Sequence, residues 1–182
     1  RPEAIHIGHD EVAGHNEQSR THWLRPGEEM LPAELFIKDI LRINTYLTAR
    51  DVEVWVWGDM LLSAEEFPAM TDGPMHGGAV GYGKAVRERL PRSIVICDWH
   101  YDDDRENFPS LVELQREGFR VIAATWKKEK TIRQFSRFAA RNRAYGMMAT
   151  SWFYVQGGNW NVVENIIHVS GQAFESGISS AQ

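Results

Sequence analysis

The chain has 182 residues, with 20 Lys and Arg against 25 Asp and Glu, and its formal net charge at pH 7 is −5. Hydrophobic residues make up 43% and charged residues 25%, as in ordinary soluble globular proteins. The acidic charge, without a clustered Lys and Arg stripe, argues against nucleic acid as a partner. No apolar run reaches the roughly 18 residues of a membrane span, and the single cysteine excludes an internal disulfide.

Strands and helices are predicted to alternate along the chain. Strands are expected where short apolar runs end in polar or aromatic residues, and helices where apolar residues recur every three or four positions. Gly118 and Gly146 are expected to end the helices that precede them. In chain order we expect strand 4–8, helix 32–49, strand 52–57, helix 84–90, strand 93–97, helix 110–117, strand 119–124, helix 131–145, strand 147–150 and helix 161–174.

Five successive strand–helix units predict an α/β fold with a parallel sheet. No Gly-rich phosphate loop follows the first strand, as it would in a doubly wound sheet, and each strand ends in Trp, Asp, Glu, His or Tyr. A (β/α)8 TIM barrel gathers its reactive groups at such strand ends but needs about 250 residues. We therefore expect residues 1–182, which begin at Arg1 without a Met, to be the C-terminal portion of one barrel domain, with about three units upstream.

The candidate chemistry begins at Asp10 and Glu11, directly after the first strand. Alternation along a strand places His6 and Asp10 on one face, and Glu11 lies where the chain turns. Adjacent carboxylates cannot flank one bond as the pair of an ordinary retaining glycosidase does, about 5 Å apart. One can act as acid/base while the other orients a neighbouring substrate group. The alternative is that both only cap a helix N-terminus.

Tryptophans at several strand ends favour a sugar-binding site. Trp57, Trp99, Trp126 and Trp152 each end a different predicted strand. Core packing explains any one of them, but four together suit the apolar faces of a pyranose ring, with Asp, His and Tyr binding its hydroxyls. The sequence therefore predicts a carbohydrate as the binding partner.

The segment His6-Ile7-Gly8-His9-Asp10-Glu11 resembles the His-x-Gly-Gly-Asp-Glu signature of glycoside hydrolase family 20, the β-N-acetylhexosaminidases. The family places this motif at the end of the fourth barrel strand, so the resemblance implies that the chain supplies strands four to eight. It also implies substrate-assisted retaining catalysis without a cofactor or an enzyme nucleophile. Glu11 matches the general acid/base, which requires a raised pKa. Asp10 matches the residue that orients the 2-acetamido group, whose oxygen forms an oxazoline.

Further residues are assigned by weaker similarity. Tyr101 and Asp103 are similar to a Tyr-x-Asp element whose Tyr donates to the acetamide carbonyl and whose Asp binds a sugar hydroxyl; a solvated acidic loop is the alternative. Two departures are His9 in place of the second glycine, expected to add bulk beside the carboxylates, and Trp152-Phe153-Tyr154 in place of Trp-x-Glu. The predicted substrate-binding residues are His6, Trp57, Asp59, Trp99, His100, Tyr101, Asp103, Trp126 and Trp152.

The histidines near the motif do not suggest a metal site. His6, His9 and His15 lack the spacing of strand or helix ligands. The leading hypothesis is therefore an exo-acting enzyme that removes terminal GlcNAc or GalNAc. Two alternatives stay open: a barrel glycosidase that pairs Glu11 with Asp59 or Asp98 as nucleophile, and a catalytically silent carbohydrate-binding relative.

Overall fold

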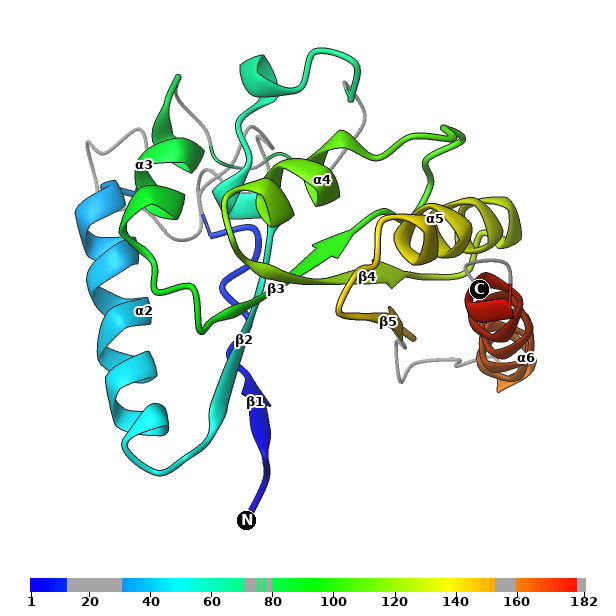
Figure 1. The fold of residues 1–182 in the computed structure, drawn as a ribbon, viewed down its shortest axis with the longest axis horizontal. Coiled ribbons are helices and arrows are strands. Elements are labelled where there is room, and N and C mark those ends of the chain that lie inside the picture. The colour runs from blue at the N-terminus through cyan, green and yellow to red at the C-terminus, as the bar shows by residue number, and fades with distance from the viewer. Residues whose placement is uncertain (13–30, 71–74, 76, 78–79, 153–159, 180–182) are drawn as a thin grey trace. The chain divides into compact units, whose positions relative to one another are not determined.

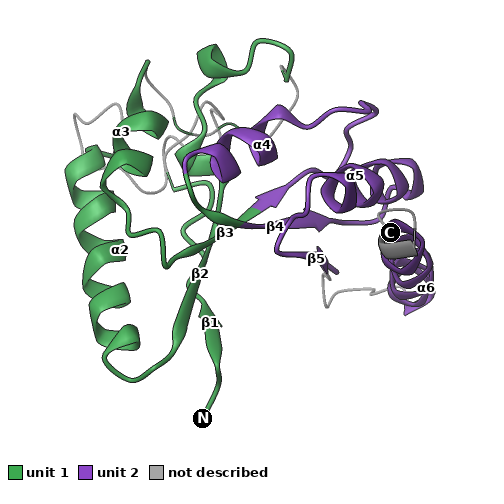
Figure 2. Ribbon diagram, viewed as in Figure 1, with its two compact units in different colours: residues 1–97, 118–120 green, residues 98–117, 121–182 purple. Residues whose placement is uncertain are grey.

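The structure is a computed structural model that describes residues 1–12, 31–70, 75, 77, 80–152 and 160–179. The chain divides into two compact units, unit 1 with residues 1–97 and 118–120 and unit 2 with residues 98–117 and 121–182 (Figure 2). In chain order the elements are β1 (Ala4–His6), α2 (Ala33–Thr48), β2 (Glu53–Trp57), the short 3-10 helices η1 (Asp59–Leu61) and η2 (Ala64–Glu66), α3 (Tyr82–Arg89), β3 (Val95–Trp99), α4 (Pro109–Arg116), β4 (Arg120–Thr125), α5 (Glu129–Arg141), β5 (Gly146–Ala149) and α6 (Trp160–Ser179) (Figure 1).

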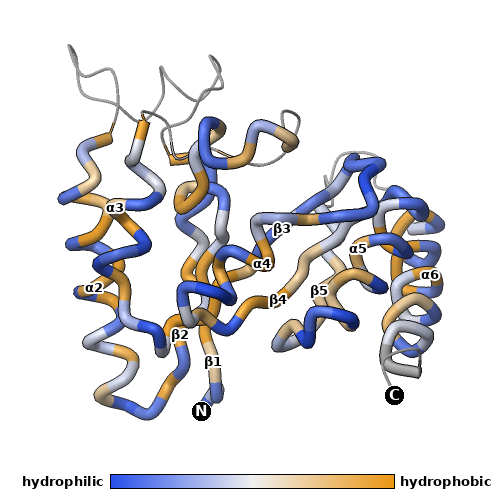
Figure 3. Tube along the Cα trace, turned by 45° about the horizontal axis from the view of Figure 1, so that its top comes forward, coloured by the Kyte–Doolittle hydropathy of each residue, from blue (hydrophilic) through white to orange (hydrophobic). Residues whose placement is uncertain are grey.

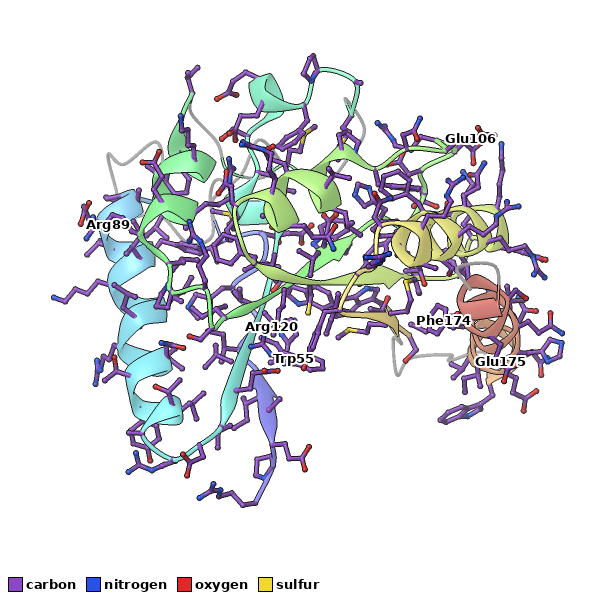
Figure 4. The ribbon with its side chains drawn as sticks, in the orientation of Figure 1. Trp55, Arg89, Glu106, Arg120, Phe174 and Glu175 are labelled. Atoms are coloured by element: carbon purple, nitrogen blue, oxygen red, sulfur yellow. The ribbon has the colours of Figure 1, made fainter. Side chains whose placement is uncertain are left out.

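Unit 1 is built on parallel strands in the order β1-β2-β3, with His6 beside Trp55 and Trp57 beside Cys97. Alternate residues of β2 face opposite sides. Its valines are buried with the apolar residues of α2, and this hydrophobic face of α2 is visible in Figure 3. At the amino ends of the strands, Glu53 accepts hydrogen bonds from Trp55 and Arg120 (Figure 4). In unit 1, ionic contacts therefore join the first residues of the strands, and buried apolar side chains hold β2 against α2.

Unit 2 pairs β4 with β5 in parallel and packs α5 against α6. Between the two helices, Ile132, Val169 and Ala173 are buried, and Phe174 packs on them while Glu175 is exposed on the same helix (Figure 4). The contact arises because apolar residues recur along α6 at helical spacing.

The α/β architecture predicted from the sequence is confirmed, because strands alternate with helices and pair in parallel, as in part of a (β/α) barrel. Element ends differ in places. β3 continues to Trp99, two residues beyond the prediction, and α6 continues to Ser179. Ile5 on β1 stays 37% exposed.

Of the two glycines predicted to end helices, one does so and the other does not. Gly118, with a φ of 92°, follows α4 as predicted. The prediction that Gly146 ends α5 is wrong, because Gly146 is the first residue of β5. Arg143 takes the left-handed conformation instead, with a φ of 54°. The N–H of Arg143 donates to the carbonyl oxygen of Ala140, and the N–H of Ala144 donates to the carbonyl oxygen of Ala139, as in a Schellman motif.

A buried arginine organises the connection between β2 and α3 in unit 1. Nη1 of Arg87 donates to the carbonyl oxygen of Leu61 over 2.6 Å and Nη2 donates to Oε1 of Glu66 over 2.8 Å. The Ser63 hydroxyl oxygen accepts a hydrogen bond from Gly83 N over 3.0 Å. These bonds satisfy a guanidinium that is almost completely buried, and through them α3 holds residues 61–66 as a fixed platform.

The close approach of Gly83 to η1 predicts a large effect of a single methyl group. A Cβ at Gly83 would lie 2.6 Å from the carbonyl oxygen of Leu61, which is main chain and cannot rotate away. We expect Gly83→Ala to lower the free energy of unfolding by about 1–3 kcal/mol. Gly171→Ala on α6 is the matched control, since nothing lies within 4 Å of its added Cβ, and it is expected to be neutral or stabilising. Urea denaturation of both variants measures the difference, and equal stability would contradict the fixed platform.

Candidate active site

A tight turn after β1 carries the two predicted catalytic carboxylates. Gly8, His9 and Glu11 have φ angles of 75°, 66° and 51°, in the left-handed region that residues other than glycine rarely adopt. A Cβ added at Gly8 would lie 3.7 Å from Oδ1 of Asp10, so this carboxyl group lies close to the motif backbone. Asp10 is half-buried and Glu11 is exposed.

The turn is held by hydrogen bonds to β2 and to the residues that follow it. Trp57 N donates to the carbonyl oxygen of Gly8 over 3.1 Å. Glu11 N donates to Oδ2 of Asp59 over 2.8 Å, and Asp59 is fully buried at the start of η1. The residue before it, Gly58, donates its N–H to the main chain of β3 over 2.9 Å. Hydrogen bonds at Asp59 and at the neighbouring Gly58 therefore connect the main chain of Glu11 to the sheet.

His6 packs on Trp57 and is uncharged near neutral pH. The two ring centroids are 4.4 Å apart. Burial, with His9 as the second cause, lowers the pKa of His6 from 6.5 to about 4. Gly8 N donates to Nδ1 over 3.1 Å, so the ring proton is on Nε2. That nitrogen is buried and has no hydrogen-bond partner among the residues that the structure describes, which suits it to donate to a ligand oxygen.

His9, which replaces the second glycine of the family motif, makes its contacts with α2. Its Nε2 lies 3.0 Å from Oδ2 of Asp39, and its ring meets the edge of Phe36 at a centroid distance of 5.6 Å. Its Nδ1 lies 3.0 Å from the carbonyl oxygen of Ile7. Both partner oxygens are acceptors, so the two bonds form together when the ring carries both protons. These contacts offset the cost of a side chain at a left-handed position, about 1–2 kcal/mol. The ring contacts Asp39 and Phe36 of α2 and the main chain of Ile7.

Four aromatic side chains gather in unit 2, from the ends of β3, β4 and β5. Trp99 and Tyr101 are stacked, with ring centroids 4.6 Å apart. Tyr101 makes edge contacts with Trp126 at 5.8 Å and with Trp152 at 6.4 Å. Nζ of Lys127 lies over the Trp126 ring, and the Trp152 side chain is 44% exposed. The group thus combines three half-buried rings with the exposed ring of Trp152.

His100 is buried beside these aromatic residues and carries both ring protons. Its Nδ1 donates to Oδ2 of Asp103 over 2.9 Å. The Ser110 hydroxyl donates to Oδ2 of Asp98 over 2.8 Å, so its oxygen accepts from His100 Nε2 over 3.1 Å. Burial by itself lowers the pKa of His100, but the charge of Asp98 and the hydrogen bonds to both aspartates outweigh burial and raise it above 6.5.

Ser110, His100 and Asp103 have the atom order of a catalytic triad but not its chemistry. A nucleophilic serine must give its proton to the histidine and reach the substrate. Ser110 is completely buried, and its proton is directed to Asp98. The arrangement is therefore a structural network that fixes the residues after β3.

Asp103, predicted to bind a sugar hydroxyl, is occupied by protein contacts. Its two carboxylate oxygens accept hydrogen bonds from His100 and from Nε of Arg105. Its main-chain oxygen accepts the hydroxyl of Thr131 over 2.8 Å. Burial raises the pKa of Asp103, but the hydrogen bonds from His100 and Arg105 outweigh burial and lower it. These contacts favour a role for Asp103 in holding its loop and weaken its assignment as a sugar ligand.

The predicted site residues form two groups, and each group lies within one unit. Unit 1 holds the motif group and unit 2 holds the aromatic group and the buried histidine. Residues 15, 153 and 154, discussed above for a metal cluster and for the last strand end, lie outside the described residues. The first group is His6, Asp10, Glu11, Trp57 and Asp59, and the second is Trp99, His100, Tyr101, Asp103, Trp126 and Trp152.

The residues that support these groups were missed in the sequence. Asp39, Ser110 and Arg105 fix His9, His100 and Asp103, respectively. Asp39 and Ser110 lie on helices, 30 and 10 residues away from their partners, so no local sequence motif predicts these contacts. Arg105 follows Asp103 by two residues, and that spacing was the one available signal.

No family model matches the chain, and no curated protein matches it. Among the described residues, no helix is long and apolar enough to cross a membrane. Over the same part of the chain, no three His, Cys, Asp or Glu side chains are grouped so that they could hold a metal ion. The functional argument therefore depends on the geometry of the two residue groups.

The raised pKa of His100 predicts a pH-dependent stability with a defined sign. The folded state holds the proton more tightly than the unfolded state, so the stabilisation is complete below pH 6.5 and is lost as pH rises through the folded pKa. We expect the contribution of His100 to the free energy of unfolding of the wild type to fall as the pH rises above 6.5. His100→Gln should remove this component and, by leaving two aspartates without their cation, cost about 3–5 kcal/mol at pH 6.

Chemical denaturation at several pH values measures this dependence. His168→Gln is the matched control, because His168 is exposed on α6 and its Nε2 lies 2.9 Å from Nε2 of Gln172 in the same helix. An unchanged pH slope in His100→Gln would show that the buried histidine does not carry both protons.

Proposed function

We propose that the chain forms strands four to eight of a (β/α)8 barrel in a retaining glycoside hydrolase that removes terminal β-linked N-acetylhexosamine by substrate-assisted catalysis. The observation that carries the proposal is the turn after β1, where Asp10 and Glu11 are adjacent and Glu11 is held by the buried Asp59. Reactive groups of such barrels lie at the carboxyl ends of strands. The resemblance of the His6–Glu11 motif to family 20 supplies the reaction class.

In the first step, Glu11 acts as general acid. The acetamide oxygen of the substrate attacks the anomeric carbon, and the bond from that carbon to the leaving oxygen breaks. Glu11 donates its carboxyl proton to the leaving oxygen, and the product is the protonated oxazoline, an oxazolinium ion with its positive charge on the former acetamide. Asp10 accepts a hydrogen bond from the acetamide N–H, which orients the oxygen and stabilises the charge. The adjacency of the two carboxylates suits this division, because the leaving oxygen and the acetamide are on neighbouring carbons.

In the second step, Glu11 acts as general base. Its carboxylate takes a proton from water, and the water oxygen attacks the anomeric carbon. The bond from that carbon to the acetamide oxygen breaks, which restores the acetamido group and the protonated Glu11. Two displacements at one carbon give net retention, and the substrate supplies the nucleophile.

Residues of unit 2 support a sugar substrate. The aromatic group of Trp99, Tyr101, Trp126 and Trp152 offers rings of the kind that stack on pyranose C–H faces. The resemblance gives the Tyr101 hydroxyl the role of donor to the acetamide carbonyl. His6, with its neutral Nε2–H, is a further donor in unit 1.

The positions of Asp59 and Asp98 speak against a conventional two-carboxylate mechanism. Either would have to present a free oxygen to the anomeric carbon as a nucleophile. Asp59 is fully buried and accepts the main-chain N–H of Glu11. Asp98 is also fully buried, and it accepts the hydroxyl of Ser110 beside His100. Both carboxylates therefore serve the protein rather than the substrate.

The proposal predicts selectivity for the acetamido group. We expect hydrolysis of p-nitrophenyl β-GlcNAc and no hydrolysis of the β-glucoside. Glu11→Gln and Asp10→Asn should each lower kcat/KM by about 10²–10⁴-fold, since each removes a group that acts in the transition state. Release of p-nitrophenol by the protein that carries the whole proposed barrel measures all three rates. Glu34→Gln is the matched control, because Glu34 is an exposed carboxylate on α2 paired with Arg89.

Two outcomes would contradict the proposal in different ways. Equal cleavage of the glucoside would replace substrate assistance by the two-carboxylate mechanism. Binding of N-acetylhexosamine by calorimetry without cleavage of either substrate would instead indicate a catalytically silent carbohydrate-binding protein.

A further inference from the structure

We propose that Asp59 is the positioning residue of Glu11: its buried carboxylate holds the main-chain N–H of Glu11 and thereby sets the direction of the acid/base side chain. The inference rests on the proposed function and assigns to Asp59 a role that differs from sugar binding and from nucleophilic attack. Asp59 would thus orient the proton donor of the proposed site.

The hydrogen bond joins two segments that are far apart in the chain. Glu11 N donates to Oδ2 of Asp59 over 2.8 Å across 48 residues. A hydrogen bond from an N–H to an ionised carboxylate is stronger than a hydrogen bond from an N–H to a neutral oxygen. Because the Asp59 side chain is fully buried, water cannot take the place of this N–H without opening the structure.

The backbone at Glu11 makes this bond consequential. Glu11 has a φ of 51°, a left-handed conformation that a residue with a Cβ adopts only when its surroundings impose it. When the bond to Asp59 is lost, the residue can return to the usual region of φ. That rotation redirects the bond from Cα to Cβ, and with it the carboxyl group at the end of the side chain.

Asp59 is itself fixed by the platform between β2 and α3. The N–H of Gly58 donates to Cys97 of β3 over 2.9 Å, and the carbonyl oxygen of Leu61 accepts from the buried Arg87. Gly83 packs directly on Leu61, where no Cβ would fit. The carboxylate therefore has a defined place against which Glu11 is aligned.

Alignment matters because proton transfer needs the donor within hydrogen-bond reach of the leaving oxygen. A displacement of about 1 Å can lower the rate by about 100-fold without weakening binding. We expect Asp59→Ala to lower kcat on p-nitrophenyl β-GlcNAc by about 100-fold and to change KM by less than about threefold. Asp59→Asn keeps an acceptor oxygen in the same place, and it should recover most of that loss.

A readout independent of activity accompanies the kinetics. Hydrogen exchange of the Glu11 amide, followed by NMR, should be faster in Asp59→Ala than in the wild type and close to wild type in Asp59→Asn. The amides of Val54 and Val56 in the buried part of β2 are the internal reference for global opening. If Asp59→Ala does not fold, Asp59→Ser takes its place, since its oxygen is one bond closer to the main chain and cannot span the same distance.

The outcomes separate this inference from the proposed function. A raised KM with unchanged kcat in Asp59→Ala would make Asp59 a sugar ligand and overturn the positioning role. Rescue of Asp59→Ala by azide, with formation of an α-glycosyl azide, would make Asp59 the nucleophile and overturn both proposals. If the wild type cleaves no substrate, the proposed function fails, and the exchange rate of the Glu11 amide alone decides whether Asp59 holds it. An unchanged exchange rate would overturn the inference.

Discussion

The hydrogen bond from the main-chain N–H of Glu11 to the Asp59 carboxylate connects the sequence motif to the fold. A turn with left-handed residues at positions 8, 9 and 11 is costly, and its conformation must be imposed by contacts outside the turn. Asp59 supplies one such contact, and the bond between His9 and α2 supplies another. Asp59 begins η1, and the carbonyl oxygen of Leu61 at the end of η1 accepts a hydrogen bond from the buried Arg87 of α3.

Each unit uses buried charge to fix the end of a strand. In unit 1 the charge is the carboxylate of Asp59, and in unit 2 it is the imidazolium of His100 between Asp98 and Asp103. Buried charges are expensive unless their hydrogen bonds are satisfied, and satisfied networks hold a single geometry. The proposed mechanism gives this cost a reason, because a catalytic site must keep its groups aligned before the substrate binds.

The sequence was sufficient for the alternation of strands and helices, because apolar periodicity and glycine stops are local signals. It was insufficient where distant residues decide the outcome. α5 ends at Arg141, and Arg143, not Gly146, takes the left-handed position after it, where main-chain hydrogen bonds to Ala139 and Ala140 close the helix end. The hydrogen bonds from His100 and Arg105 to Asp103 also could not be predicted, because the sequence alone does not show which carboxylates are bonded within the protein.

In the proposed mechanism, the substrate provides its own nucleophile. The most direct measurement compares kcat for p-nitrophenyl β-glycosides that carry a 2-acetamido or a 2-trifluoroacetamido group. Fluorine withdraws electrons from the carbonyl oxygen, so the account predicts a fall in kcat of about 100-fold or more, equal to at least about 2.7 kcal/mol in the barrier. Equal values of kcat for the two substrates would contradict the account, because a carboxylate of the enzyme would then be the nucleophile.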